Sequence, residues 1–143
     1  MRLDYSKEEL IELGAEITTR EIYQQPQVWQ EAFDTYKANQ ADIEAFLQMI
    51  DRKHDYIKVI LTGAGTSAYV GDTLIPYFKS IYDERKWNFN AIATTDIVAS
   101  PLHHLHKDIP TVLVSFARSG NSPESVATVD LAKQIVDKLY QIT

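Results

Sequence analysis

Two short segments of the sequence combine glycine with hydroxyl-bearing side chains, and each directly follows an apolar run. The first, GAGTSA, covers residues 63–68, and the second, ARSGNSPES, covers residues 117–125. Glycine lets an anion approach the backbone closely, while hydroxyls and the unpaired N–H groups at a helix start donate hydrogen bonds to it. We therefore predict a phosphate-binding site formed by Gly65, Thr66, Ser67, Arg118, Ser119, Gly120, Asn121 and Ser122.

Two acidic residues near these segments are candidate contacts for the rest of a ligand. Asp96 ends a predicted strand, and Glu124 lies in the first turn of a predicted helix. A carboxylate accepts hydrogen bonds from the hydroxyl groups of a ligand. Each residue also fits a local capping role, because a carboxylate is favoured in the first turn of a helix.

Short apolar runs at residues 57–63, 89–95 and 111–116 predict three buried strands. Helical patterns follow at residues 67–82, with a kink expected at Pro76, and at residues 122–139. This alternation predicts right-handed crossovers and a doubly wound parallel sheet of order 2-1-3, a flavodoxin-like α/β fold. The first and third strands are then neighbours, so both glycine-hydroxyl segments flank the switch point where ligands bind.

Residues 1–55 are predicted to form a helical N-terminal segment, and residues 56–143 the first part of the α/β domain. Ser6 and Glu9 fit a capping box. Thr18 offers a second helix start, and Pro26 is expected to end that helix before two further ones. The last residues, LYQIT, have the pattern of a fourth strand that has just begun, so we expect an incomplete domain.

Composition narrows the function classes. The sequence has 143 residues, 45% of them hydrophobic, a net charge of −6 and no cysteine. The acidic balance without a Lys/Arg cluster argues against a nucleic-acid surface. The absence of cysteine and of an apolar leader or spanning run favours a cytoplasmic protein that does not enter membranes.

A different ligand class also fits the first segment. GAGTSA satisfies the dinucleotide fingerprint G-x-G-x-x-G/A, which would make the chain the NAD-binding domain of a dehydrogenase. That fingerprint needs an acidic residue about 20 positions further on, at the end of the second strand. Asp96 follows Gly65 by about 30 positions, and Asp83 lies before the strand. A dinucleotide also needs no second hydroxyl-rich loop, so we favour phosphate binding.

The two segments together resemble the SIS (sugar isomerase) domain family, whose loops hold phosphosugars. The segments SFARSGNSPESVA and ATTDIV most resemble those of the tagatose-6-phosphate ketose/aldose isomerases, also known as galactosamine-6-phosphate deaminase/isomerases. The resemblance runs from about residue 19 to the end. The serines of the family motifs match Ser67, Ser119 and Ser122. Arg118 stands where relatives often have glutamine, and it could supply charge-assisted contacts instead.

The resemblance implies an enzyme that acts on a hexose or amino-hexose 6-phosphate and needs no cofactor or metal. Such chemistry passes through an enediol or enolamine, and it requires a base near C2 and an acid at the ring oxygen. The family usually places both elsewhere in the chain or in a partner subunit, so the catalytic residues here are unknown. Relatives often dimerise, so a homo-dimer or higher oligomer is expected, and this segment alone is expected to be inactive.

Two further interpretations stay open at this point. A non-catalytic SIS module that senses a sugar phosphate would carry the same loops. The histidines at positions 103, 104 and 106 could hold a metal or open a sugar ring, but no carboxylate or cysteine stands at a spacing that would complete a zinc site.

Overall fold

Residues 5–143 are described in the computed structural model, in which the chain forms two compact units, residues 1–49 and 50–143. The first unit holds α1 (Lys7–Glu12) and most of α2 (Glu16–Lys53). The second holds an α/β sandwich whose elements are, in chain order, β1 (Ile57–Gly63), η1 (Gly65–Ser67), α3 (Ala68–Ile81), β2 (Trp87–Ala91), α4 (Thr94–Ala99), α5 (Pro101–His104), β3 (Thr111–Phe116), α6 (Pro123–Ile135) and β4 (Leu139–Ile142).

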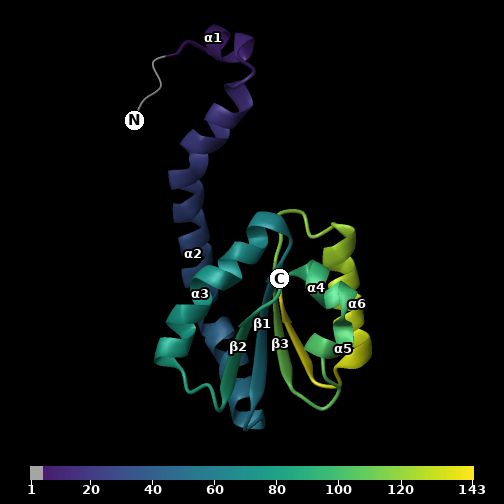
Figure 1. Ribbon diagram of the computed structural model, residues 1–143. Coiled ribbons are helices and arrows are strands. Elements are labelled where there is room, and N and C mark those ends of the chain that lie inside the picture. Colours follow the sequence, from purple (N-terminus) through teal and green to yellow (C-terminus); the bar gives the residue numbers. More distant parts are fainter. Residues whose placement is uncertain (1–4) are drawn as a thin grey trace. The chain divides into compact units, whose positions relative to one another are not determined.

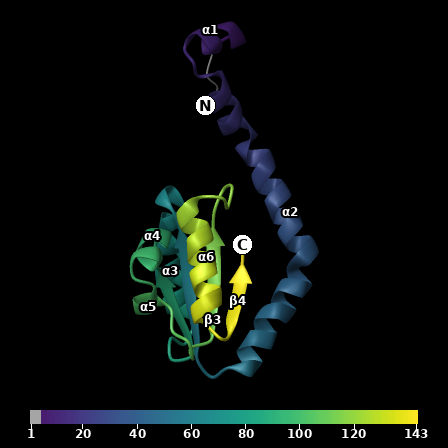
Figure 2. The ribbon, with the colours of Figure 1, turned by 90° about the vertical axis from the view of Figure 1, so that its right-hand side faces the viewer.

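The four strands form one parallel sheet in the order β2-β1-β3-β4. This confirms the predicted order 2-1-3, and the pattern at LYQIT is indeed a fourth strand that extends the sheet beyond β3. Helix α3 covers one face of the sheet, and α4, α5 and α6 cover the other (Figure 1). The layers are also visible after a quarter turn, with α6 lying in front of β3 and the arrow of β4 seen beside α6 (Figure 2).

Each face of the sheet has its own packed layer. On the face of α4 and α6, Ile60 of β1 and Leu113 of β3 are buried in one cluster with Ile97, Leu105 and Ala132. Apolar burial of this kind contributes roughly 25 cal/mol per Å² and is the main term that holds the sandwich together. The strands therefore read as nearly continuous apolar runs because both of their faces are covered.

On the opposite face, aromatic side chains pack between α3 and the edge strand β2. The rings of Phe78 and Phe89 stack with their centroids 4.9 Å apart, and Tyr82 lies 5.3 Å from Phe89. Trp87 extends this cluster along β2. The packing holds the last turns of α3 against β2. Nearer the start of α3, the helix lies close to the sheet at Gly71, where an added Cβ would come within 3.1 Å of the Cβ atoms of Leu61 and Ala91.

The end of α2 is anchored within the second unit. Ile50 is fully buried. The Asp51 carboxylate accepts a hydrogen bond from the Trp87 indole N–H at 2.9 Å and pairs with the Lys86 ammonium at 2.8 Å. His54 lies within 2.9 Å of the Tyr140 hydroxyl of β4. Residues 50–54 thus contact both edge strands of the sheet.

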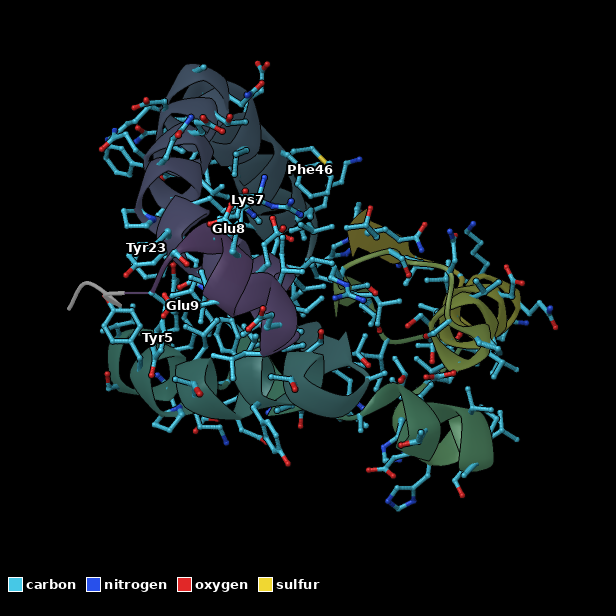
Figure 3. All side chains as sticks on the ribbon, turned by 90° about the horizontal axis from the view of Figure 1, so that it is seen from above. Tyr5, Lys7, Glu8, Glu9, Tyr23 and Phe46 are labelled. Carbon is cyan, nitrogen blue, oxygen red and sulfur yellow. The ribbon has the colours of Figure 1, made fainter. Side chains whose placement is uncertain are left out.

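The N-terminal unit is helical, and its first cap was predicted correctly. Ser6 and Glu9 form the capping box, with the Ser6 hydroxyl accepting from the Glu9 N–H and the Glu9 carboxylate from the Ser6 N–H. Glu9 is labelled on α1 in Figure 3. Residues 1–4 of the predicted segment lie outside the described residues.

The prediction of several short helices after α1 is wrong, because α2 is a single helix of 38 residues. Thr18 lies inside it rather than at a helix start, and so does Pro26. Proline in a helix removes one hydrogen bond and leaves the carbonyl four residues earlier without its donor. That carbonyl belongs to Ile22, whose side chain is exposed, so water can satisfy it. None of the helices in residues 5–143 combines the length and apolar character needed to cross a membrane.

Two other predicted bounds need correction. The second strand spans Trp87–Ala91 rather than residues 89–95, and Thr94–Ala99 is a helix. The last helix ends at Ile135, so Leu139 lies in β4 rather than on the helix. Residue propensity could not place the end of the second strand, because β-branched residues such as Thr94 and Thr95 occur in strands and also at helix starts. Tertiary packing decides between the two.

Candidate phosphate-binding site

The first loop is a tight turn that folds back onto the end of β1. A side chain at Gly63 would place its Cβ 2.7 Å from the Ser67 carbonyl carbon, so only glycine fits there. Gly65 has a φ of 55°, a conformation that other residues rarely adopt. The turn closes with a hydrogen bond from the Ser67 N–H to the Ala64 carbonyl at 3.2 Å. The glycines are therefore explained by geometry.

The start of α3 is left without a side-chain cap. Within the described residues, the Ser67 hydroxyl makes no capping hydrogen bond, although Ser67 stands at the N-cap position. Thr66 is exposed beside it. Because η1 runs directly into α3 and its carbonyls accept from the Ala68 N–H, the helix start that could meet an anion is that of η1.

The second loop follows β3 in the same way. Residues 117–121 are exposed, and Gly120 has a φ of 70°. The Ser119 hydroxyl accepts from the Asn121 N–H at 3.4 Å. Ser122 is the N-cap of α6 and its hydroxyl accepts from the Ser125 N–H, and Pro123 occupies the first helical position. Both loops thus end in a helix start that faces the carboxyl edge of the sheet.

Sheet register places the two loops side by side. Gly63 at the end of β1 is paired with Phe116 at the end of β3, and Thr62 with Ser115. Paired positions in a sheet lie about 4.8 Å apart. The two glycine-hydroxyl segments therefore leave neighbouring strands at the same edge, which is the switch-point arrangement that the strand order predicts.

A cavity of about 500 Å³ lies beside the second loop. It brings together Arg118, Ser119 and Gly120 with the buried Ser125. The lining also includes Ser115, Ala117, Val126, Val129, Asp130, Lys133 and Thr143. The predicted residues Gly65, Thr66, Ser67, Asn121 and Ser122 are not part of this lining. That all eight grip one phosphate remains a prediction.

Hydroxyl groups also lie beneath the loops, and the sequence patterns did not single them out. The Thr94 hydroxyl donates to the Gly63 carbonyl at 3.3 Å, and the Thr128 hydroxyl donates to the Thr94 carbonyl at 3.3 Å. These two bonds tie α6 and α4 to the end of β1. Among the described residues, Thr62 has the one buried side-chain oxygen without a partner. The sequence signal for Thr62 is a hydroxyl-bearing residue at the end of an apolar strand, directly before Gly63.

The two acidic candidates both lie in first turns of helices. Asp96 was predicted to end the second strand, and this is wrong. It is exposed in the first turn of α4, where its N–H donates to the Ala93 carbonyl. Glu124 is in the first turn of α6. Neither carboxylate borders the cavity beside the second loop.

The histidines lie towards the other end of the sheet. The Lys58 ammonium, at the start of β1, donates to the His104 carbonyl at 2.6 Å. Lys58 and Gly63 are separated by about 17 Å of extended strand. Burial lowers the pKa of His104, and His103 and Lys58 lower it further. In the part of the chain that the structure describes, no group of three or more His, Cys, Asp or Glu side chains could hold a metal ion.

A second cavity, of about 450 Å³, lies within the N-terminal unit. Tyr5, Lys7 and Tyr23, labelled in Figure 3, line it together with Leu10, Glu16, Thr19 and Arg20. Arg20 is paired with Glu16 at 3.8 Å and with Glu21 at 3.5 Å. Its charge is already compensated, so this cavity offers less to an anion than the strand ends do.

Comparison with known proteins identifies relatives of this chain by sequence and by fold. No family model matches the chain. The chain is 44% identical over 137 residues to the D-galactosamine-6-phosphate deaminase AgaS of Shewanella sp. strain ANA-3, and 42% identical over 125 residues to that of Escherichia coli. These alignments cover 96% and 87% of the chain but 35% and 32% of the two relatives.

Two solved structures are similar in fold and sequence. A Clostridium novyi NT protein assigned as a tagatose-6-phosphate ketose/aldose isomerase matches 96% of the chain with a TM-score of 0.87 and 42% identity. The tagatose-6-phosphate ketose/aldose isomerase of Escherichia coli matches 85% with a TM-score of 0.76 and 39% identity. The chain spans about a third of each, 34% and 32%, in keeping with the predicted incomplete domain. Over the segment that aligns, the chain is similar to the galactosamine-6-phosphate deaminases and tagatose-6-phosphate isomerases.

Proposed function

We propose that the two loops at the carboxyl edge of the sheet bind the phosphate of a hexose or amino-hexose 6-phosphate. The observation that carries this proposal is the pairing of Gly63 with Phe116, because it sets two hydroxyl-bearing helix starts on neighbouring strands. Hydroxyl donors and helix N–H groups together suit a phosphate dianion. Arg118 adds a positive charge at the rim of the adjoining cavity.

For the whole protein we propose the reaction of its relatives. This is either the deamination of galactosamine 6-phosphate or an aldose–ketose isomerisation of the tagatose 6-phosphate type. Both pass a proton between C1 and C2 through an enolamine or enediol. The phosphate grip would hold these carbons in place, so that binding energy far from the reacting bond lowers the barrier. The two loops therefore act as an anchor, and the base and ring-opening acid lie beyond them.

The dinucleotide alternative has less support. Strand β2 ends at Ala91, and the residues that follow are Ile92 and Ala93, so no carboxylate stands at the strand end where a ribose would need one. The relatives are all sugar-phosphate proteins by name. A non-catalytic sensor would share the loops, but no relative reported above carries such a name.

Binding can be measured directly by isothermal titration calorimetry with galactosamine 6-phosphate, tagatose 6-phosphate and NAD. We expect the sugar phosphates to bind and NAD not to bind. Ser119→Ala combined with Ser122→Ala should weaken sugar-phosphate binding by about a hundredfold, since each lost hydrogen bond to an anion is worth about 1.4 kcal/mol or more.

The matched control is Ser80→Ala, which removes an exposed serine hydroxyl near the end of α3 whose only assigned role is a bond to the Tyr77 carbonyl. It should leave the affinity unchanged. Sugar-phosphate binding that survives the double substitution would remove the site assignment, and binding of NAD alone would remove the proposed function.

We also propose that the protein is cytoplasmic and forms a homo-dimer or higher oligomer. The support is indirect, from the names of metabolic relatives and from the lack of a membrane-spanning helix in residues 5–143. Light scattering coupled to gel filtration would test the oligomer, and a monomeric mass at micromolar concentration would contradict it.

A further inference from the structure

The cavity of about 500 Å³ beside the second loop is lined by three serines from different parts of the fold. Ser115 belongs to β3, Ser119 to the loop that follows it, and Ser125 to the first turn of α6. Ser125 is 5% exposed and Ser115 is half-buried, whereas Ser119 is exposed. Of the three, only Ser119 is among the residues predicted to bind phosphate, so the other two need a separate explanation.

The cavity adjoins the edge of the sheet from which both loops leave. Ser115 lies one residue before the end of β3 and is paired with Thr62, which directly precedes Gly63. Ser125 is on α6 just inside its N-cap, Ser122. The two serines are therefore close to the loops proposed to bind phosphate, although they come from a strand and a helix.

The hydroxyl proton of Ser125 has no acceptor among the described residues. The Ser122 hydroxyl donates to the Ser125 oxygen at 2.8 Å, so Ser125 is the acceptor of that hydrogen bond. The Ser119 oxygen likewise accepts, from the Asn121 N–H at 3.4 Å. Ser115 has no side-chain hydrogen bond within residues 5–143. All three hydroxyls can therefore donate into the cavity, and for the buried Ser125 an unpaired proton would be costly.

Charged side chains of the lining favour an anion. Arg118 and Lys133 line the cavity with one carboxylate, that of Asp130. None of these three takes part in an ion pair within residues 5–143. The lining therefore carries one more positive than negative charge, and its hydroxyl donors add to that preference.

We infer that Ser115 and Ser125 contact the ligand directly, an inference that rests on the proposed function. Their hydroxyls donate to the phosphate oxygens of the sugar phosphate, together with Ser119 and the Arg118 guanidinium. A fully ionised phosphate accepts hydrogen bonds and donates none, so a lining whose hydroxyls all have a proton to donate is suited to it. The phosphate is then held by the wall of the cavity as well as by the loops.

The test is calorimetry of single variants with galactosamine 6-phosphate and tagatose 6-phosphate. Ser115→Ala and Ser125→Ala should each weaken binding about tenfold, because each removes one hydrogen bond to an anion. The loss should be the same for both ligands, since they share the phosphate and differ in the sugar. A loss confined to one ligand would place the serines on the sugar and overturn their assignment to the phosphate.

Three further variants separate ligand contact from stability. Ser115→Thr keeps the hydroxyl on a side chain that suits a strand and should retain the affinity. Ser125→Cys keeps the size of the side chain but is a weak donor, so it should fold and still lose affinity. Thr128→Val is the matched control, because it removes a buried hydroxyl of α6 that bonds to the Thr94 carbonyl and does not line the cavity. It should lower the melting temperature and leave the affinity unchanged.

Failure of the inference and failure of the proposed function give different results. A wild-type chain that binds neither sugar phosphate overturns the proposed function and the inference with it. A wild-type chain that binds, with Ser115→Ala and Ser125→Ala binding equally well, overturns the inference alone. A lower melting temperature of these two variants at unchanged affinity would give the serines a structural role only, which also overturns the inference.

Discussion

At the scale of single residues, the glycines and hydroxyls of the two loops serve different purposes. Gly63 lets the turn close against Ser67, and Gly120 adopts a positive φ. The hydroxyls divide into those committed to the fold, such as Thr94 and Thr128, and those that remain open to a ligand. Thr62 fits neither group, because its buried oxygen has no partner among the described residues.

Thr62 therefore gives a clear stability prediction. Thr62→Val should leave the melting temperature unchanged or raise it by roughly 2–4 °C, because it removes an unsatisfied hydroxyl worth about 1 kcal/mol. Thr94→Val is the matched control and should lower it, because it removes the bond to the Gly63 carbonyl. Calorimetric unfolding of both variants checks this, and equal destabilisation by the two would show that Thr62 has a partner after all.

At the scale of elements, helix ends and strand edges carry the polar contacts that position the sandwich. Asp51, in the last turn of α2, receives hydrogen bonds from Lys86 and Trp87 at the start of β2. Hydrogen bonding to Lys86 is the main cause that lowers the pKa of Asp51, Trp87 adds to it, and desolvation opposes it. Because β2 is an edge strand, one of its sides has no neighbouring strand, and the end of α2 makes contacts at the start of β2 instead.

The pH dependence of this contact follows from the sign of the shift. A carboxyl whose pKa is lowered on folding adds stability above its unfolded pKa, near 4, and loses that stability as pH falls through the folded value. Asp51→Asn should therefore lower the melting temperature at pH 7. The difference in melting temperature between Asp51→Asn and wild type should shrink as the pH is lowered towards 3. A gap that stays constant over this range would mean that the charge of Asp51 contributes nothing.

At the scale of the whole molecule, the edge of the sheet proposed to bind phosphate has no recognised base beside it among residues 5–143. The carboxylates Asp96 and Glu124 sit in helix first turns, and the histidines at positions 103 and 104 lie towards the opposite end of β1. The chain spans about a third of the length of its relatives. Binding and catalysis are therefore expected to be separable.

We predict that the 143-residue chain binds galactosamine 6-phosphate but does not convert it. Ammonia release, followed with a coupled glutamate dehydrogenase assay, should not exceed the background rate even at saturating substrate. The positive control is a relative of full length. Turnover by this chain above background would mean that a base lies among its own residues, and Glu124→Gln and Asp96→Asn would then identify it.

Much of this architecture could be predicted from local pattern. The apolar runs of β1 and β3, the Ser6–Glu9 capping box and the glycine-hydroxyl turns each depend on neighbouring residues, so periodicity and turn chemistry were enough to find them. The order of the strands also followed, because right-handed crossovers leave few topologies.

Other features were decided only by tertiary structure. Thr94 begins a helix where a strand was expected, because the packing of its buried side chain outweighs a propensity of about 1 kcal/mol. Pro26 stays inside α2 although residues 20–39 are exposed, and no packing contact explains it. The hydrogen bonds of Thr94 and Thr128 join residues that lie 31 and 34 positions apart in the sequence, so no local spacing could predict them. The sequence alone determined which groups could bind an anion, because that depends on residue type and local turn. Only the packing of α6 against β1 and α4 decided which hydroxyls are left to do so, because that depends on which buried donors are already satisfied.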